Sequence, residues 1–148
     1  MQNNKLVIAA LMVLLFSSCN ILLRKLPPYI ITKPFCEISG NSSNYSYAGI
    51  KFNFHNKGEK TISRITVSFA LFDAKTKNNP FTGSNVFEIT KSELIMPDAH
   101  TSVVLTLDPY IYAAPAEPYL IDYFYISEIR YTDGSVWNDK YGIYNQGI

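Results

Sequence analysis

Two neighbouring stretches of the sequence decide the fold: YAGIKFNFHN (residues 47–56) and ISRITVSFALFD (residues 62–73). Apolar residues occupy every second position in both, which is the pattern of a β-strand with one buried face. These positions are Ala48, Ile50, Phe52 and Phe54 in the first stretch and Ile65, Val67, Phe69 and Leu71 in the second. Because the residues between the stretches include Gly58 and suit a turn, the sequence predicts that the two strands pair as an antiparallel hairpin.

Similar strand patterns extend to both sides of this pair. An Asp-Gly dipeptide at residues 133–134 marks a hairpin turn before the last of them. Strands are expected at residues 29–38, 86–95 (one strand or two short ones), 101–108, 119–131 and 136–139. About seven strands, with no helix beyond the N-terminal segment, predict an all-β fold. The expected architecture is an antiparallel sandwich of two sheets, with a barrel as the alternative.

The amino-acid composition agrees with one β-rich domain and argues against a nucleic-acid partner. The chain has 148 residues, of which 47% are hydrophobic and 14% aromatic, as expected for a globular protein rich in strand-forming residues. Its 13 basic and 12 acidic residues leave a net charge of +1. A nearly neutral chain has no field that attracts nucleic acid, so no nucleic-acid partner is expected.

The N-terminus has the order of a signal peptide. A short start with Lys5 is followed by eleven apolar residues (6–16) and then by Ser17, Ser18 and Cys19. A helix over the apolar run would span about 16 Å, roughly half of a bilayer core. Two alternatives remain open, an uncleaved membrane anchor over residues 6–23 and a soluble protein.

The residues before Cys19 resemble the lipobox of bacterial lipoproteins, although Phe16 stands where that motif favours Leu. The resemblance implies removal of residues 1–18 and attachment of lipid, such as palmitate, to Cys19. It places the protein in the bacterial cell envelope, anchored to a membrane and either periplasmic or surface-exposed. Residues 19–34, with Pro27 and Pro28, are expected to form the lipidated N-terminus and a tether, followed by the folded domain at 35–148.

The second cysteine, Cys36, has no partner in the mature chain. Two cysteines, one of them lipidated, leave neither a disulfide nor a cysteine zinc site. Cys36 is therefore expected to be a buried structural residue.

The end of the second stretch, FALFD (residues 69–73), and its lead-in resemble the FxLYD domain of bacterial secreted proteins and lipoproteins. Asn56, Gly58 and Ile62 match the lead-in, and Phe72 stands where the family has Tyr. The resemblance implies an immunoglobulin-like sandwich and an envelope location, without a settled activity. The pattern itself predicts that Phe69 faces the core and that Asp73 caps the following turn.

Motifs of catalysis and of phosphate binding are absent. The chain has no G-x-S-x-G, no H-E-x-x-H and no glycine-rich phosphate loop, so neither an enzyme nor a cofactor nor a metal is expected. His55 is expected on the polar face of its strand, and His100 in a turn. A weak set of calcium ligands remains an alternative to a simple hairpin turn: Asp133, Ser135, Asn138 and Asp139.

Aromatic residues near the C-terminus are the best candidates for ligand binding. The candidate residues are Tyr110, Tyr112, Tyr119 and Trp137. Within residues 119–131, the face carrying most tyrosines and isoleucines is expected to be core, whereas Phe124 falls on the other face. The alternative is that the aromatics form an exposed platform.

These observations predict a non-catalytic binding or assembly module of the bacterial envelope. Its partners are expected to be the membrane, through the lipid anchor, and another envelope protein that meets a strand edge or the loop at residues 109–118. The alternative is a carbohydrate or cell-wall binding module that uses surface aromatics, with a glycan as partner.

Overall fold

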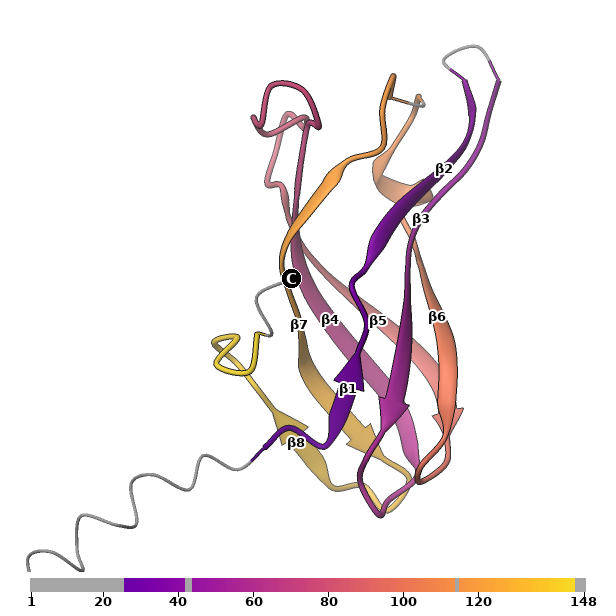
Figure 1. The fold of residues 1–148 in the computed structure, drawn as a ribbon, viewed down its shortest axis with the longest axis vertical. Helices are drawn as coiled ribbons and strands as arrows, with labels where there is room; N and C mark the ends of the chain where they lie inside the picture. Colours follow the sequence, from indigo (N-terminus) through magenta and orange to yellow (C-terminus); the bar gives the residue numbers. More distant parts are fainter. Residues whose placement is uncertain (1–25, 42–43, 114, 146–148) are drawn as a thin grey trace, which may run out of the picture.

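The computed structural model describes residues 26–41, 44–113 and 115–145. They form two antiparallel four-stranded sheets packed face to face (Figure 1). The first sheet is centred on β3 (Asn44–Asn56), with β6 (His100–Thr106) along one edge and β1 (Tyr29–Ile31) and β2 (Phe35–Asn41) along the other. The second has the order β5 (Val86–Ile95), β4 (Ile62–Phe72), β7 (Leu120–Tyr131) and β8 (Val136–Asn138).

The predicted all-β sandwich is confirmed. The chain crosses between the sheets from β3 to β4, from β5 to β6 and from β6 to β7, which gives the immunoglobulin-like arrangement. The described residues contain eight strands instead of about seven, because the segment at 29–38 is interrupted near Pro34, which lacks a backbone N–H for a ladder. The segment at 86–95 is one strand, and the Asp133-Gly134 turn joins β7 to β8 as predicted.

The predicted hairpin between residues 47–56 and 62–73 is wrong. The first stretch lies in β3 and pairs with β1, β2 and β6, whereas the second forms β4 and pairs with β5 and β7. Period-two alternation fixes which face of a strand is buried, but it does not fix the neighbour along the hydrogen-bonding edge. Here the connection crosses the core, so the apolar faces of the two strands oppose each other.

The core lies between these two faces. Phe52 of β3 meets Phe124 of β7 edge to face, with 5.0 Å between ring centroids. Phe69 of β4 stacks on Phe87 of β5 at 5.6 Å. Cys36 is a buried free cysteine, which confirms its expected structural role.

The burial pattern of β7 differs from the predicted one because the strand contains two β-bulges. One extra residue is inserted near Tyr123 and another near Ser127, where the pairing with β4 shifts. Each insertion reverses which side of the strand faces the core. Phe124 and Ile126 are buried, whereas Tyr123 is 65% exposed, so the predicted tyrosine-rich core face is wrong over this half of the strand.

The chain meets the sandwich at one end, beside the β3–β4 turn. Lys57 N–H donates to the carbonyl of Pro28 at 2.9 Å, and β1 follows immediately. β1 lies within the segment expected to be tether, and its Tyr29 is 1% exposed. The predicted signal peptide (residues 1–18) and Cys19 lie outside the described residues. Within the described ranges, no helix has the length and apolar character needed to cross a membrane.

Candidate binding site

An aromatic cleft of about 410 Å³ is lined by the β4–β5 loop and the β6–β7 connection, which lie at the end of the sandwich opposite the β3–β4 turn (Figure 1). Its aromatic walls come from the β4–β5 loop, from β5, from the β6–β7 connection and from the residue before β7. These residues, which we call the aromatic cleft, are Phe81, Phe87, Tyr110, Tyr112 and Tyr119. Tyr112 is 93% exposed, so its ring is available to a partner.

Ring contacts hold the walls of the aromatic cleft in place. Phe87 contacts Phe81 at 5.1 Å and Tyr110 at 5.0 Å between centroids, both edge to face. Phe81 also contacts Tyr119 at 5.4 Å. Edge-to-face contacts of this kind orient rings as well as burying them, so four of the five rings form one connected group.

The β4–β5 loop is braced by its own polar side chains. Asp73 ends β4 as predicted, because its carboxylate accepts hydrogen bonds from the N–H groups of Lys75 and Thr76 and from the Thr76 hydroxyl. These bonds hold the pKa of Asp73 below its usual value. Further along, the Asn79 amide donates to the carbonyl of Gly83 and accepts from the N–H of Phe81, which fixes the loop around that ring.

Tyr110 is positioned by a 3₁₀ turn, η2 (Asp108–Tyr110), after β6. The Asp108 carboxylate accepts hydrogen bonds from the N–H of Ala48 and from the hydroxyl of Thr106, both at 2.9 Å. Ile111, the residue that follows the turn, is 5% exposed and packs in the core. The β6–β7 connection is thus tied to β3 before it reaches Tyr112.

The structure brings together three of the four predicted binding residues. Tyr110, Tyr112 and Tyr119 line the aromatic cleft. Trp137 does not, because it lies on β8, where it packs against Tyr29 and Tyr144 and lines a separate hollow near Pro28.

Phe81 and Phe87 belong to the aromatic cleft but were not among the predicted binding residues. Phe81 follows Pro80 in a polar loop, and Phe87 reads as an ordinary core position of an alternating strand. The isolated phenylalanine in the polar loop was the available signal.

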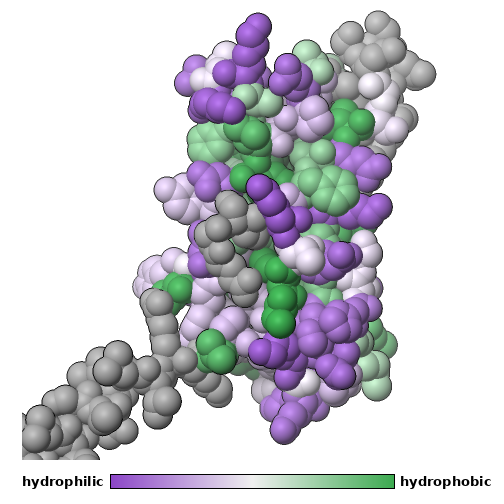
Figure 2. Space-filling model, in the orientation of Figure 1, coloured by the Kyte–Doolittle hydropathy of each residue, from purple (hydrophilic) through white to green (hydrophobic). Residues whose placement is uncertain are grey.

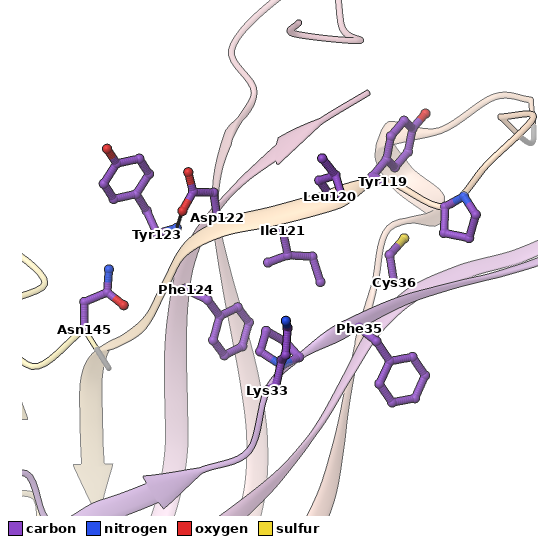
Figure 3. A pocket seen from close by; sticks show the side chains of 12 residues that line it. Lys33, Phe35, Cys36, Tyr119, Leu120, Ile121, Asp122, Tyr123, Phe124 and Asn145 are labelled. Atoms are coloured by element: carbon purple, nitrogen blue, oxygen red, sulfur yellow. Dashed lines mark hydrogen bonds between the residues drawn. The ribbon is translucent and has the colours of Figure 1, made fainter. Parts of the chain in front are cut away.

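A second cleft, of about 390 Å³, lies between β2 and the first half of β7. Figure 3 shows Ile121 and Phe124 pointing into this cleft while Tyr123 points away from it. Burial raises the pKa of the Cys36 thiol and of the Tyr119 hydroxyl, both of which border the cleft. A thiol whose pKa is raised has less thiolate at neutral pH, so Cys36 is poorly suited to act as a nucleophile.

Both histidines and Asp133 take part in local contacts. The Asp98 carboxylate accepts a hydrogen bond from the Nε2 atom of His55 at 2.9 Å, and the His55 ring stacks on His100 at 3.8 Å between centroids. Asp133 accepts from Ser135 and pairs with Lys60, and these bonds lower its pKa.

The predicted calcium alternative gains no support from this geometry. The Asp139 carboxylate accepts from the N–H groups of Ile143 and Tyr144, one at each oxygen, so both of its oxygens are used within its own turn. Among the described residues, no cluster of three or more His, Cys, Asp or Glu side chains has the arrangement of a metal site. Figure 2 shows apolar residues along the middle of one face, in its upper and lower halves, with polar residues around them.

Comparisons of the chain with models of protein families, with curated proteins and with solved structures found no match.

Proposed function

We propose that the protein is a lipoprotein of the bacterial cell envelope whose β-sandwich binds another envelope protein without catalysing a reaction. Lipid on Cys19 would hold the domain at a membrane after removal of the signal peptide. The aromatic cleft would be the binding surface. Membership of the FxLYD family, on the FALFD motif and its lead-in, is part of this proposal.

The observation that carries the proposal is that Pro28, near the start of the described residues, bonds to the β3–β4 turn, whereas the loops that line the aromatic cleft lie at the opposite end of the sandwich (Figure 1). The seven residue-to-residue steps from Cys19 to Leu26 reach at most about 25 Å. β3 alone, with 13 residues, spans about 40 Å. A domain anchored through Cys19 can therefore present the aromatic cleft on the side away from the membrane.

The polar groups around the aromatic cleft favour a protein over a sugar. Asn79 and Asn85 use their amides on carbonyls of the β4–β5 loop and of β4. The cleft itself is lined mainly by rings, Pro80 and Pro109, together with Thr82 and with Ser84, whose hydroxyl is bonded to the backbone of Val86. Exposed aromatics beside prolines are typical of surfaces that bind peptide segments.

Two measurements in living bacteria test the proposal. Palmitate labelling should mark the wild-type chain and not Cys19→Ala. A photo-crosslinking amino acid in place of Tyr112 should give one adduct of defined mass, and the same amino acid in place of Ser92, which is exposed on β5, should not. The adduct should decline with Phe81→Ala, because Phe81 supports the cleft wall.

Equal palmitate label in wild type and Cys19→Ala would contradict the anchor. Equal crosslinking at positions 112 and 92 would contradict the binding surface.

The second candidate function is glycan binding through Tyr110 and Tyr112, and their exposed rings favour it. Sugar rings stack on flat aromatic faces, so cosedimentation of the protein with insoluble cell-wall polysaccharide should then be lost in Tyr112→Ala. Unchanged cosedimentation of that variant would exclude this role for Tyr112.

A further inference from the structure

A hollow of about 540 Å³ lies on the sheet formed by β5, β4, β7 and β8, and it is lined almost wholly by polar side chains. The neighbours of these residues along the strands, such as Phe87, Phe69, Phe124 and Ile126, are buried in the core. The hollow is therefore on the outer face of the sheet. Its residues, which we call the polar trough, are Ser68, Glu88, Tyr125, Ser127, Glu128, Asn138 and Lys140.

Strand register places the members of the polar trough in two adjacent rows. Ser68 pairs with Glu88 on one side and with Tyr125 on the other. In the next row, Glu128 pairs with Asn138. Four strands at a spacing of about 4.8 Å make the trough about 14 Å wide, which accommodates two or three sugar rings.

Most hydrogen-bonding groups of the polar trough have no partner among the described residues. Glu88 uses one carboxylate oxygen to accept from Ser127 at 2.9 Å, and Glu128 uses one to accept from Arg130 at 3.3 Å. No hydrogen bond to another described residue involves the side chains of Ser68, Tyr125, Asn138 or Lys140. The trough thus offers an amide, an ammonium, two hydroxyls and two carboxylate oxygens to a ligand.

The fold holds two of these groups in position. Ser127 sits at a β-bulge of β7, is 9% exposed and directs its hydroxyl to Glu88. Bulges commonly re-aim side chains beside functional sites. Gly142 lies against the Tyr125 ring, where an added Cβ would come within 3.1 Å, so one edge of that ring is fixed.

From this arrangement we infer that the polar trough is a binding site for a neutral, hydroxyl-rich oligosaccharide. Vicinal sugar hydroxyls donate to carboxylate oxygens and accept from amide and ammonium groups, and a pyranose face packs on an aromatic ring. Two glutamates against one lysine disfavour uronic acids and other anionic sugars. The site is separate from the aromatic cleft and does not depend on the lipid anchor.

Nuclear magnetic resonance of the lipid-free chain from residue 20 onward, which contains the whole domain, tests the inference. The probes are cellotriose, mannotriose and chitotriose, each titrated into the millimolar range. At least one should shift the backbone resonances of Ser68, Tyr125 and Asn138 in a saturable way. Glu88→Ala and Asn138→Ala should each weaken that binding about tenfold, because each removes hydrogen bonds to the sugar.

Ser92→Ala is the matched control, because Ser92 is exposed on β5 and lies outside the trough. It should leave the affinity unchanged. The absence of saturable shifts with all three sugars would overturn the inference, and so would shifts confined to Tyr110, Tyr112 and Tyr119. Neither result would affect palmitate labelling or crosslinking at position 112, so the proposed function is tested separately.

Discussion

At the scale of single residues, Asn56 connects the β3–β4 turn to the β5–β6 turn at one end of the sandwich. It is fully buried, and its amide donates to the carbonyls of Lys60, Ile95 and Met96 at 2.9–3.1 Å. Its side-chain oxygen accepts from the N–H of Gly58 at 3.0 Å. These bonds explain why Asn56, with Gly58 two residues later, stands in the turn before β4.

Removal of this side chain should destabilise the domain strongly. Asn56→Ala leaves three carbonyls and one N–H without their partner, and we expect a loss of about 3 kcal/mol in the free energy of unfolding. Urea denaturation followed by circular dichroism measures it. Asn53→Ala, an exposed asparagine on the same strand, is the control and should change the value by about 0.5 kcal/mol or less. Equal effects of both variants would contradict the role assigned to Asn56.

Tyr29 makes stability depend on pH in the alkaline range. Burial raises the pKa of its hydroxyl from 10.0 to about 12. The folded state therefore keeps the proton while the unfolded chain releases it above pH 10, so this contribution is complete below pH 10 and is lost as pH rises towards 12. The loss should reach about 2–3 kcal/mol.

Tyr29→Phe should remove that part of the alkaline loss. Its effect at neutral pH should be small, because the hydroxyl has no hydrogen-bond partner among the described residues. Urea midpoints at pH 8, 10 and 11 measure both effects, with Tyr112→Phe as an exposed control. A Tyr29→Phe variant that loses stability between pH 8 and 11 as steeply as wild type would rule out this explanation.

At the scale of secondary structure, β7 shows where sequence patterns stop being sufficient. Strict alternation places Tyr123 in the core and Phe124 outside, and the bulge near Tyr123 reverses both. Tyr123 has a positive φ of 50°, which is unusual for an aromatic residue, and its N–H is bonded by the Asp122 carboxylate at 2.8 Å. The local sequence does not predict such a bulge, because the bulge arises from the pairing of β7 with β4.

Alanine substitutions at these adjacent positions test the bulge. Phe124→Ala should cost about 3–5 kcal/mol, because it removes a ring packed against Phe52 and Phe69. Tyr123→Ala should cost about 0.5 kcal/mol, because its side chain is largely in solvent. Thermal and urea unfolding of both variants give the comparison. A larger loss of unfolding free energy for Tyr123→Ala than for Phe124→Ala would contradict the bulge and support a strictly alternating strand.

At the scale of the whole molecule, the sequence was sufficient for the class of fold and for much of the core, but not for strand pairing or for the site. Alternation predicted the buried faces of β3 and β4, because burial is a property of each strand alone. Which strands are neighbours depends on where the chain crosses the core. Tyr110, Tyr112 and Tyr119 could be grouped from their proximity in sequence, whereas Trp137 was separated from them by the length of the sandwich.

The extent of the folded unit gives the last prediction. β1 belongs to the core, since Tyr29 stacks on Phe54 at 5.7 Å and meets Trp137 edge to face at 5.5 Å. A chain that begins at Leu26 should unfold with the same urea midpoint as one that begins at residue 20. A chain that begins at Thr32 loses Tyr29 and Ile31 and should be less stable by about 3–6 kcal/mol, a large fraction of the stability of a domain this size. Fluorescence of Trp137, the single tryptophan, reports both transitions. If the chain from Thr32 unfolds at the same midpoint, β1 is part of the tether and the folded domain begins at β2.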